Sequence, residues 1–185
     1  MSRLGCCYRD GTGVIRDSQL AMDWFLKAAN LDDTESMAAL GDIYREGNGT
    51  PKDLGLAFDW YHKAAEKGYT YGMLHLGCGY RDGTLQKRDH KQAVEWFKKA
   101  ADLDDPFAMF CLGYAYMTGS GVRCSRRIGV QWIRRAAKRG EVDALRWMKQ
   151  DFRRRCINAV IAFVVVFGAV MHLLLNWSNA DNLGR

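Results

Sequence analysis

The side chains best suited to catalysis or metal binding are scattered along the 185 residues rather than grouped. The four histidines are His62, His75, His90 and His172. None of them makes an i, i+4 pair or a His-Cys spacing that suits a metal ion, and no nucleophile motif frames a serine. The Gly-x-Gly segments follow predicted helices and lack a Lys-Ser/Thr continuation, so they indicate turns rather than phosphate-binding loops. We therefore expect a protein that is not an enzyme and holds no metal or cofactor.

Six cysteines could form a disulfide framework, but only in a secreted chain. They are Cys6, Cys7, Cys78, Cys111, Cys124 and Cys156. The first residues do not show the apolar stretch of a signal peptide, and no two cysteines have the C-x-x-C spacing. We expect reduced thiols in a reducing compartment.

A period of 36 residues defines the elements that must position any functional side chain. Leu-Gly pairs, tyrosines, tryptophans and Ala-Ala pairs each recur four times at this step. The glycines are Gly5, Gly41, Gly77 and Gly113, and the tryptophans are Trp24, Trp60, Trp96 and Trp132. Regular self-similarity of this length is the sequence signature of a repeat architecture.

The spacing inside one unit predicts a helix, a loop and a second helix. Ser36, Leu40 and Tyr44 stand four residues apart and share a helix face. Pro51 cannot continue that helix, and a second helix is predicted from about Leu54 to Glu66. We expect the glycines and alanines to let two helix backbones approach closely, and the tryptophans to fill the gap between neighbouring hairpins.

One hairpin cannot bury its apolar face alone, so successive units must stack. Ala144, Met148 and Phe152 continue the first-helix columns beyond the fourth unit. The predicted fold is all-α: a right-handed α-solenoid of four 36-residue helix-loop-helix repeats plus a capping helix, followed by one transmembrane helix. The predicted segments are the solenoid at 1–152, a basic juxtamembrane segment at 153–156, the membrane helix at 157–175 and a tail at 176–185.

The repeated motifs Leu-Gly-x-x-Tyr, Gly-x-Gly, Ala-x-x-Trp and Lys-Ala-Ala are similar to those of the Sel-one-like repeat (SLR) family. The resemblance covers residues 1–152. It implies a superhelical scaffold that binds other proteins, often as an adaptor in signalling or membrane-associated complexes, without common catalytic residues. Leu85, Ser125 and Gly129 depart from the pattern. The first helix lacks its opening turn, which suggests a truncated start or a covering partner. The cysteine pair that staples each repeat in one branch of the family is missing.

Residues 157–175 predict a membrane span. Only Asn158 and His172 are clearly polar within Ile157–Leu175. A helix of this length reaches roughly 28 Å, close to the ~30 Å hydrocarbon core of a bilayer. Seven Lys and Arg precede the span within twenty residues, and only Arg185 follows it. The positive-inside rule then predicts a tail-anchored, single-pass protein with its repeats on the cytoplasmic side.

Positive charge is concentrated in one part of the chain. Residues 1–122 hold 14 Lys and Arg against 17 Asp and Glu, whereas residues 123–156 hold 12 against 3. Because the excess begins as far back as Arg123 and extends to Arg153, Arg154 and Arg155 beside the predicted span, we expect the last repeat to face anionic lipid headgroups. The simpler alternative is a plain topology signal. No interleaved aromatic platform or recognition motif supports nucleic acid as the partner.

The resemblance places the first helices of the repeats along a concave face, where a partner protein would bind. The side chains that we expect there are Arg9, Asp42, Arg45, Arg81, Phe110, Tyr114 and Met117. Arginines and aromatic anchors are typical of binding hot spots. The alternative is that each arginine pairs locally with the acid that follows it and serves only the end of its helix.

These observations favour a non-enzymatic, membrane-tethered scaffold or adaptor that binds an unidentified protein partner on the cytoplasmic side. An alternative is an immunity or inhibitor protein that neutralises a membrane-active toxin or a secreted effector. A third hypothesis is that the protein is a hydrolase, as suggested for some cysteine-rich members of the family that the chain resembles.

Overall fold

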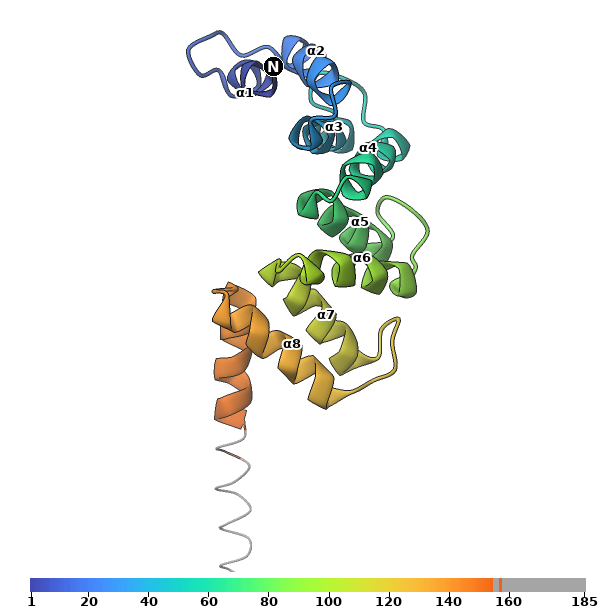
Figure 1. Cartoon of the computed structure of the whole chain (residues 1–185), viewed down its shortest axis with the longest axis vertical. Helices are drawn as coiled ribbons and strands as arrows, with labels where there is room; N and C mark the ends of the chain where they lie inside the picture. Colours follow the sequence, from blue (N-terminus) through green and yellow to red (C-terminus); the bar gives the residue numbers. More distant parts are fainter. Residues whose placement is uncertain (155–156, 158–185) are drawn as a thin grey trace, which may run out of the picture. The chain divides into compact units, whose positions relative to one another are not determined.

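The computed structural model describes residues 1–154 and 157, which form helices and loops and contain no strand. Within residues 1–141 eight helices follow one another (Figure 1): α1 (Ser2–Asp10), α2 (Ser18–Ala29), α3 (Thr34–Glu46), α4 (Leu54–Glu66), α5 (Thr70–Asp82), α6 (His90–Asp102), α7 (Pro106–Thr118) and α8 (Arg126–Lys138). Residues 142–154 are also helical. The chain divides into two compact units, Met1–Glu141 and Val142–Arg185.

Aspartates and glycines mark the helix boundaries. Asp33, Asp53 and Asp105 are N-caps whose carboxylates accept a hydrogen bond from the backbone N–H three residues later. Such caps stabilise a helix start by about 1 kcal/mol. The odd-numbered helices end at a glycine in the left-handed region, for example Gly47 with φ of 79°, a conformation that a side chain disfavours. The predicted second helix from Leu54 to Glu66 is confirmed.

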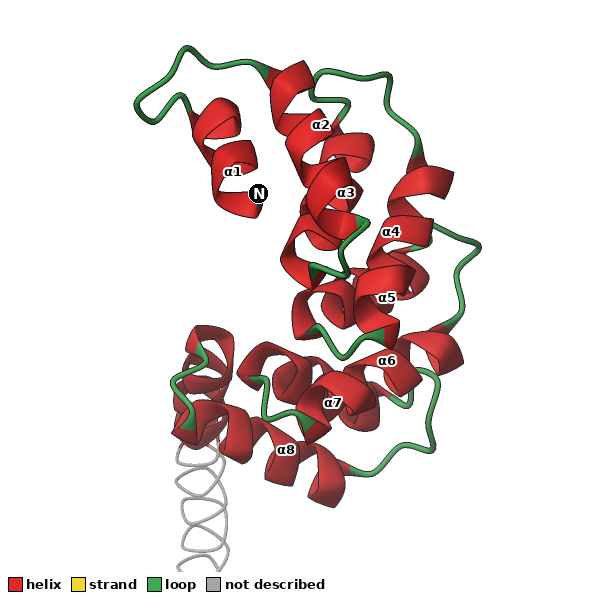
Figure 2. Ribbon diagram, turned by 45° about the horizontal axis from the view of Figure 1, so that its top comes forward, coloured by secondary structure: helices red, strands yellow, loops and turns green. Residues whose placement is uncertain are grey.

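Within Met1–Glu141 each helix packs against the next one in the chain. Figure 2 shows this row as a curve, with α1, α3 and α5 on its inner side and α2, α4 and α6 on its outer side. The loop inside a hairpin, such as 47–53 between α3 and α4, is longer than the loop between hairpins, such as 67–69 between α4 and α5. Each hairpin buries its apolar side chains against the next. An all-α solenoid of four repeats is therefore confirmed.

The glycine of each first helix accommodates a bulky side chain of the second helix. A Cβ atom built on Gly41 would stand 2.6 Å from Cε1 of Tyr61, and one on Gly77 would stand 2.6 Å from Cε1 of Phe97. The same contact joins two further pairs, Gly5 with Phe25 and Gly113 with Ile133. The expected backbone-to-backbone approach holds in the last hairpin, where a Cβ on Gly113 would stand 2.9 Å from the carbonyl oxygen of Gly129. In the other three hairpins a ring occupies the space that the glycine leaves.

The tryptophans lie beside these buried residues and form a second, less buried column. Trp96 is buried, and its ring meets that of His62, from the preceding hairpin, edge to face at 5.5 Å. Lys99 Nζ lies 4.0 Å from the centroid of the Trp96 ring. The other tryptophans each carry a cation three residues later in the same way: Lys27 over Trp24, Lys63 over Trp60 and Arg135 over Trp132. Trp96 thus fills a gap between neighbouring hairpins, as expected.

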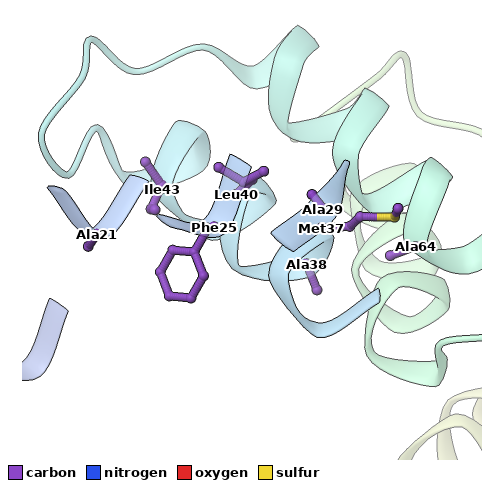
Figure 3. Close-up of a cluster of buried hydrophobic side chains, with 8 residues drawn as sticks. All are labelled: Ala21, Phe25, Ala29, Met37, Ala38, Leu40, Ile43 and Ala64. Carbon is purple, nitrogen blue, oxygen red and sulfur yellow. The ribbon is translucent and has the colours of Figure 1, made fainter. Parts of the chain in front are cut away.

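A cluster of buried apolar side chains joins the first two hairpins (Figure 3). Ala21, Phe25 and Ala29 come from α2, and Leu40 and its neighbours come from α3. Alanines separate the larger side chains, so α2 and α3 pack closely. Each fully buried Leu or Phe contributes about 1.5–3 kcal/mol through its removal from water, and this burial is what couples one repeat to the next.

The C-terminal predictions fall largely outside the described residues. Residues 142–154, which include the predicted capping positions, are helical and belong to the second unit. Arg153 and Arg154 are exposed at the end of this helical stretch. Arg155 and the predicted span lie outside the described residues, apart from Ile157. No helix in the described part of the chain has both the length and the hydropathy that crossing a bilayer requires.

Candidate partner-binding surface

Three arginines that were predicted on the concave face recur at the ends of α1, α3 and α5, each beside an acid. Arg9 Nε lies 2.8 Å from Asp10 Oδ1, and Arg81 Nε lies 2.8 Å from Asp82 Oδ1. Arg45 Nη2 lies 2.6 Å from Glu46 Oε1. The structure therefore shows the local pairing that was the alternative interpretation. Surface pairs of this kind are worth up to about 1 kcal/mol, and the row consists of ion pairs rather than of unpaired cations.

Asp42 organises a hydrogen-bonded cluster on α3, α4 and α5. Its Oδ1 accepts from the Tyr61 hydroxyl at 2.7 Å and from Arg45 Nη2 at 3.2 Å. Its Oδ2 accepts from the Tyr71 hydroxyl at 3.0 Å. Arg45 Nε also donates to the Tyr61 oxygen at 3.1 Å. The cluster ties the second repeat to the third, because Tyr71 belongs to the next hairpin.

His75 completes this cluster by stacking on the aromatic rings. Its ring is nearly parallel to that of Tyr61, with centroids 4.5 Å apart, and lies 4.4 Å from that of Tyr71. Burial, together with the Asp42 carboxylate, raises the pKa of Tyr71 to about 12 and also raises that of Tyr61. Burial lowers the pKa of His75. The phenols stay protonated at neutral pH and serve as hydrogen-bond donors, which suits a rigid platform.

A cavity of about 190 Å³ opens between the first two repeats, next to this cluster. Arg9 and Asp42, both predicted partner-binding residues, line it. The remaining lining residues are Ser2, Cys6, Phe25, Glu35, Ala38, Ala39, Tyr69 and Tyr71. This end of the inner face therefore offers charged and phenolic groups.

A larger cavity of about 360 Å³ lies between the third and fourth repeats; we call it the repeat 3/4 cavity. Three predicted residues, Arg81, Phe110 and Tyr114, line it together. The other lining residues are Asp82, Arg88, His90, Ala93, Val94, Phe97, Cys111, Ala115 and Ser120. Tyr114 is 55% exposed. This end of the inner face is apolar and aromatic, with a basic rim.

Met117, the last of the predicted residues on α7, is half-buried. It lines neither cavity; a Cβ on Gly129 of α8 would stand 2.7 Å from Met117 Cγ. Because Gly129 replaces the alanine of the other repeats, Met117 packs into the space inside the fourth hairpin. Its place in the partner-binding row stays a prediction.

Sequence reasoning did not single out Tyr61, Tyr71 or His75. A signal existed for Tyr61, since it stands in the column of Phe25 and Phe97 with one added hydroxyl. A buried hydroxyl needs a partner, and Asp42 on the facing helix was already a candidate. Nothing comparable marks Tyr71 or His75, because their positions vary freely from repeat to repeat.

The described part of the chain holds no group of three His, Cys, Asp or Glu side chains placed to bind a metal ion. The described cysteines, Cys6, Cys7, Cys78, Cys111 and Cys124, are free thiols. Burial raises the pKa of the Cys111 thiol to about 12, so it stays protonated and unreactive at neutral pH.

The Sel1 repeat profile matches four consecutive segments, residues 1–33, 34–69, 70–105 and 106–141. The chain belongs to the Sel1 repeat family. Sel1 repeat proteins generally mediate protein–protein interactions. The four matched segments coincide with the four helical hairpins, so the family assignment and the fold agree.

Three solved structures of bacterial proteins are similar to this chain. A protective antigen of uropathogenic Escherichia coli with an SLR fold is 35% identical, with a TM-score of 0.74 over 77% of this chain and 31% of that one. A Sel1 repeat protein from Oxalobacter formigenes is 31% identical, with a TM-score of 0.73 over 77% of this chain and 58% of that one. Cysteine rich protein B of Helicobacter pylori is 26% identical, with a TM-score of 0.56 over 70% of this chain and 93% of that one. The chain thus spans about a third of the length of the Escherichia coli protein and somewhat over half of the length of the Oxalobacter formigenes protein. A search of curated proteins found no significant match.

Proposed function

We propose that this Sel1 protein is a non-enzymatic scaffold, tethered to a membrane, that binds a partner protein through the inner face of its odd-numbered helices. The observation that carries the proposal is the pairing of two unlike surfaces on that face. The Asp42 cluster is polar and rigid, whereas the repeat 3/4 cavity is apolar and open. A partner segment along the inner face would meet hydrogen-bond donors at one end and apolar anchors at the other, as hot spots require.

The membrane part of the proposal rests on the sequence of residues 157–175 and on the charges before it. We propose a single-pass, tail-anchored span with the repeats on the cytoplasmic side and the tail 176–185 on the other side. Basic residues near a membrane surface each gain about 1 kcal/mol from anionic lipids. Arg153, Arg154 and Arg155 would then lie at the headgroup level.

Affinity purification of the full-length chain in mild detergent, followed by mass spectrometry, tests the scaffold proposal. The Tyr114→Ala variant removes a side chain of the inner face that is 55% exposed, so the cost to folding is small. Leu103→Ala is the matched control, because Leu103 follows α6 and is 54% exposed. We expect a stoichiometric partner with the wild type and the control, and a weakened one with Tyr114→Ala. Equal recovery with both variants, or no partner above background, would contradict the proposal.

Alkaline carbonate extraction of cell membranes tests the tether. We expect the full-length chain to stay with the membrane pellet, as an integral protein does, and a version that ends at residue 156 to be released. Release of the full-length chain would contradict a membrane span.

A further inference from the structure

Three equivalent positions between successive repeats differ in the side chain that lies beside a buried ring. In each case the ring that packs on the first-helix glycine borders the space between one hairpin and the next. Between repeats 1 and 2 the Arg9 guanidinium lies over the Phe25 ring, 5.9 Å from its centroid, and the equivalent residues line two smaller cavities of about 190 and 50 Å³. Between repeats 2 and 3 the His75 imidazole stacks on Tyr61 at 4.5 Å.

Neither kind of filling is present between repeats 3 and 4. Cys111 stands 36 residues after His75, so a small thiol occupies the place of the stacked imidazole. Arg81, the equivalent of Arg9, pairs with Asp82 as Arg9 pairs with Asp10, and its Nη1 lies 3.8 Å from the Cys111 sulfur. The result is the repeat 3/4 cavity of about 360 Å³, a volume at the lower end of the roughly 300–1,000 Å³ of ligand pockets.

The walls of this cavity are suited to an apolar group. Val94 and Phe97 come from α6, and Phe110 and Ala115 come from α7. Cys111 adds an uncharged wall, because burial keeps its thiol protonated. A bulky apolar or aromatic side chain would contact Phe97 from the place that His75 takes against Tyr61.

The rim of the cavity is suited to a carboxylate. Two arginines, Arg81 and Arg88, and one histidine, His90, line it against a single acid, Asp82. Arg81 gives Nε and one terminal nitrogen to Asp82, at 2.8 and 2.9 Å, but its other terminal nitrogen faces only the Cys111 sulfur at 3.8 Å. A thiol is a weak acceptor, so this Nη1 is ready to donate to a stronger one. Arg88 Nη2 reaches only the backbone oxygen of Asp82, at 3.3 Å.

We propose that the repeat 3/4 cavity is the specificity pocket of the scaffold and takes a partner-protein segment that carries a bulky apolar side chain directly beside a carboxylate. This inference rests on the proposed function, since it identifies the partner by its chemistry. The apolar side chain enters between α6 and α7, and the carboxylate accepts from Arg81 Nη1 at the rim. A charge-assisted hydrogen bond of this kind is stronger than a neutral one.

The probe is N-acetyl-L-phenylalanine, which has one aromatic side chain beside one carboxylate. N-acetyl-L-phenylalaninamide lacks the carboxylate, and N-acetyl-L-alanine lacks the ring. Each is titrated into the full-length chain in lipid nanodiscs with ¹³C-methyl-labelled valine, and the Val94 methyl signals report on the cavity. We expect saturable shifts with a Kd of about 1 mM for the acid and binding about tenfold weaker for either analogue.

Two variants test the residues, and one serves as control. Arg81→Gln should weaken the acid about tenfold without changing the binding of the amide. Cys111→His restores the side chain that closes the previous gap, and should abolish the Val94 shifts. Arg135→Gln is the control. Arg135 also pairs with an aspartate, Asp104, but it lies on α8 and does not line the cavity. The valine signals outside the cavity show whether each variant is folded.

The inference is overturned if Val94 does not respond to the acid, or responds equally to all three probes. It is also overturned if Arg81→Gln binds the acid as the wild type does. These outcomes are separate from those of the scaffold proposal. A partner that is captured equally by the wild type and Arg81→Gln leaves the scaffold standing and removes the pocket. A response of Val94 without any captured partner supports the pocket and contradicts the scaffold.

Discussion

Replacing Gly41 by alanine should destabilise the solenoid, although alanine is the better helix former. The added Cβ would stand 2.6, 2.7 and 2.9 Å from three atoms of the Tyr61 ring. Carbon atoms prefer separations of about 3.5–4.0 Å, so the ring must retreat by about 1 Å. Tyr61 is completely buried and is held by Asp42 and His75, so its retreat disturbs the whole cluster.

The expected magnitude follows from two opposing effects. Overpacking a buried site costs about 1–3 kcal/mol, and the rigid surroundings of Tyr61 favour the upper end. The gain in helix propensity from glycine to alanine offsets about 1 kcal/mol. The net loss is about 2 kcal/mol, which corresponds to a melting temperature lower by about 4–8 °C for a chain of this size.

Thermal melting of the full-length chain in detergent, followed by circular dichroism at 222 nm, measures this effect. The matched control is Gly55→Ala on α4, because Gly55 is exposed and its added Cβ would meet only Asp53 Oδ1, at 3.2 Å. We expect that control to melt at or slightly above the wild-type temperature. The reasoning is refuted if Gly41→Ala melts at or above the wild-type temperature, or if both variants lose the same amount.

Three further variants test the Asp42 cluster and the loops. Tyr61→Phe removes the hydroxyl that bridges Asp42 and Arg45 and should cost about 1 kcal/mol; an unchanged melting temperature would show that the bridge contributes nothing. Because burial lowers the pKa of His75, the unfolded chain binds more protons as the pH falls below about 6.5, so stability decreases there. His75→Phe keeps a stacked ring and should flatten melting temperature against pH between about 6.5 and 5; an identical pH profile would contradict the assignment. Gly68 has φ of 87° and nothing within 4 Å of an added Cβ, so Gly68→Ala should cost about 1–2 kcal/mol through the backbone alone, and full stability would refute that reasoning.

The periodicity of the sequence was sufficient to predict the hairpins, because each repeat has the same spacing of apolar residues, caps and glycines. It could not show which of two adjacent residues packs on the glycine. Trp60 and Tyr61 recur with the same period, and only the rotation of α4 about its axis buries the second and leaves the first half-buried. That rotation depends on the packing of all the neighbouring side chains at once.

The candidate site was less predictable, because it depends on what differs between repeats. Arg9, Arg45 and Arg81 occupy one column, yet they cover a ring, join a hydrogen-bonded cluster and line an open cavity. The role of each arginine depends on the side chain 30 residues later, which lies on the first helix of the following repeat. These side chains are Ala39, His75 and Cys111. A repeat pattern treats such neighbours as independent, whereas the structure brings Arg81 Nη1 within 3.8 Å of the Cys111 sulfur.

Site-specific photo-crosslinking in cells that express the full-length chain tests the central claim most directly. A benzophenone amino acid is placed at position 114 on the inner face, or at position 103 with nearly equal exposure. Our account predicts one discrete adduct with a partner protein from position 114, in the membrane fraction, and none from position 103. Adducts from position 103 alone, or equally from both positions, would contradict a partner held on the inner face.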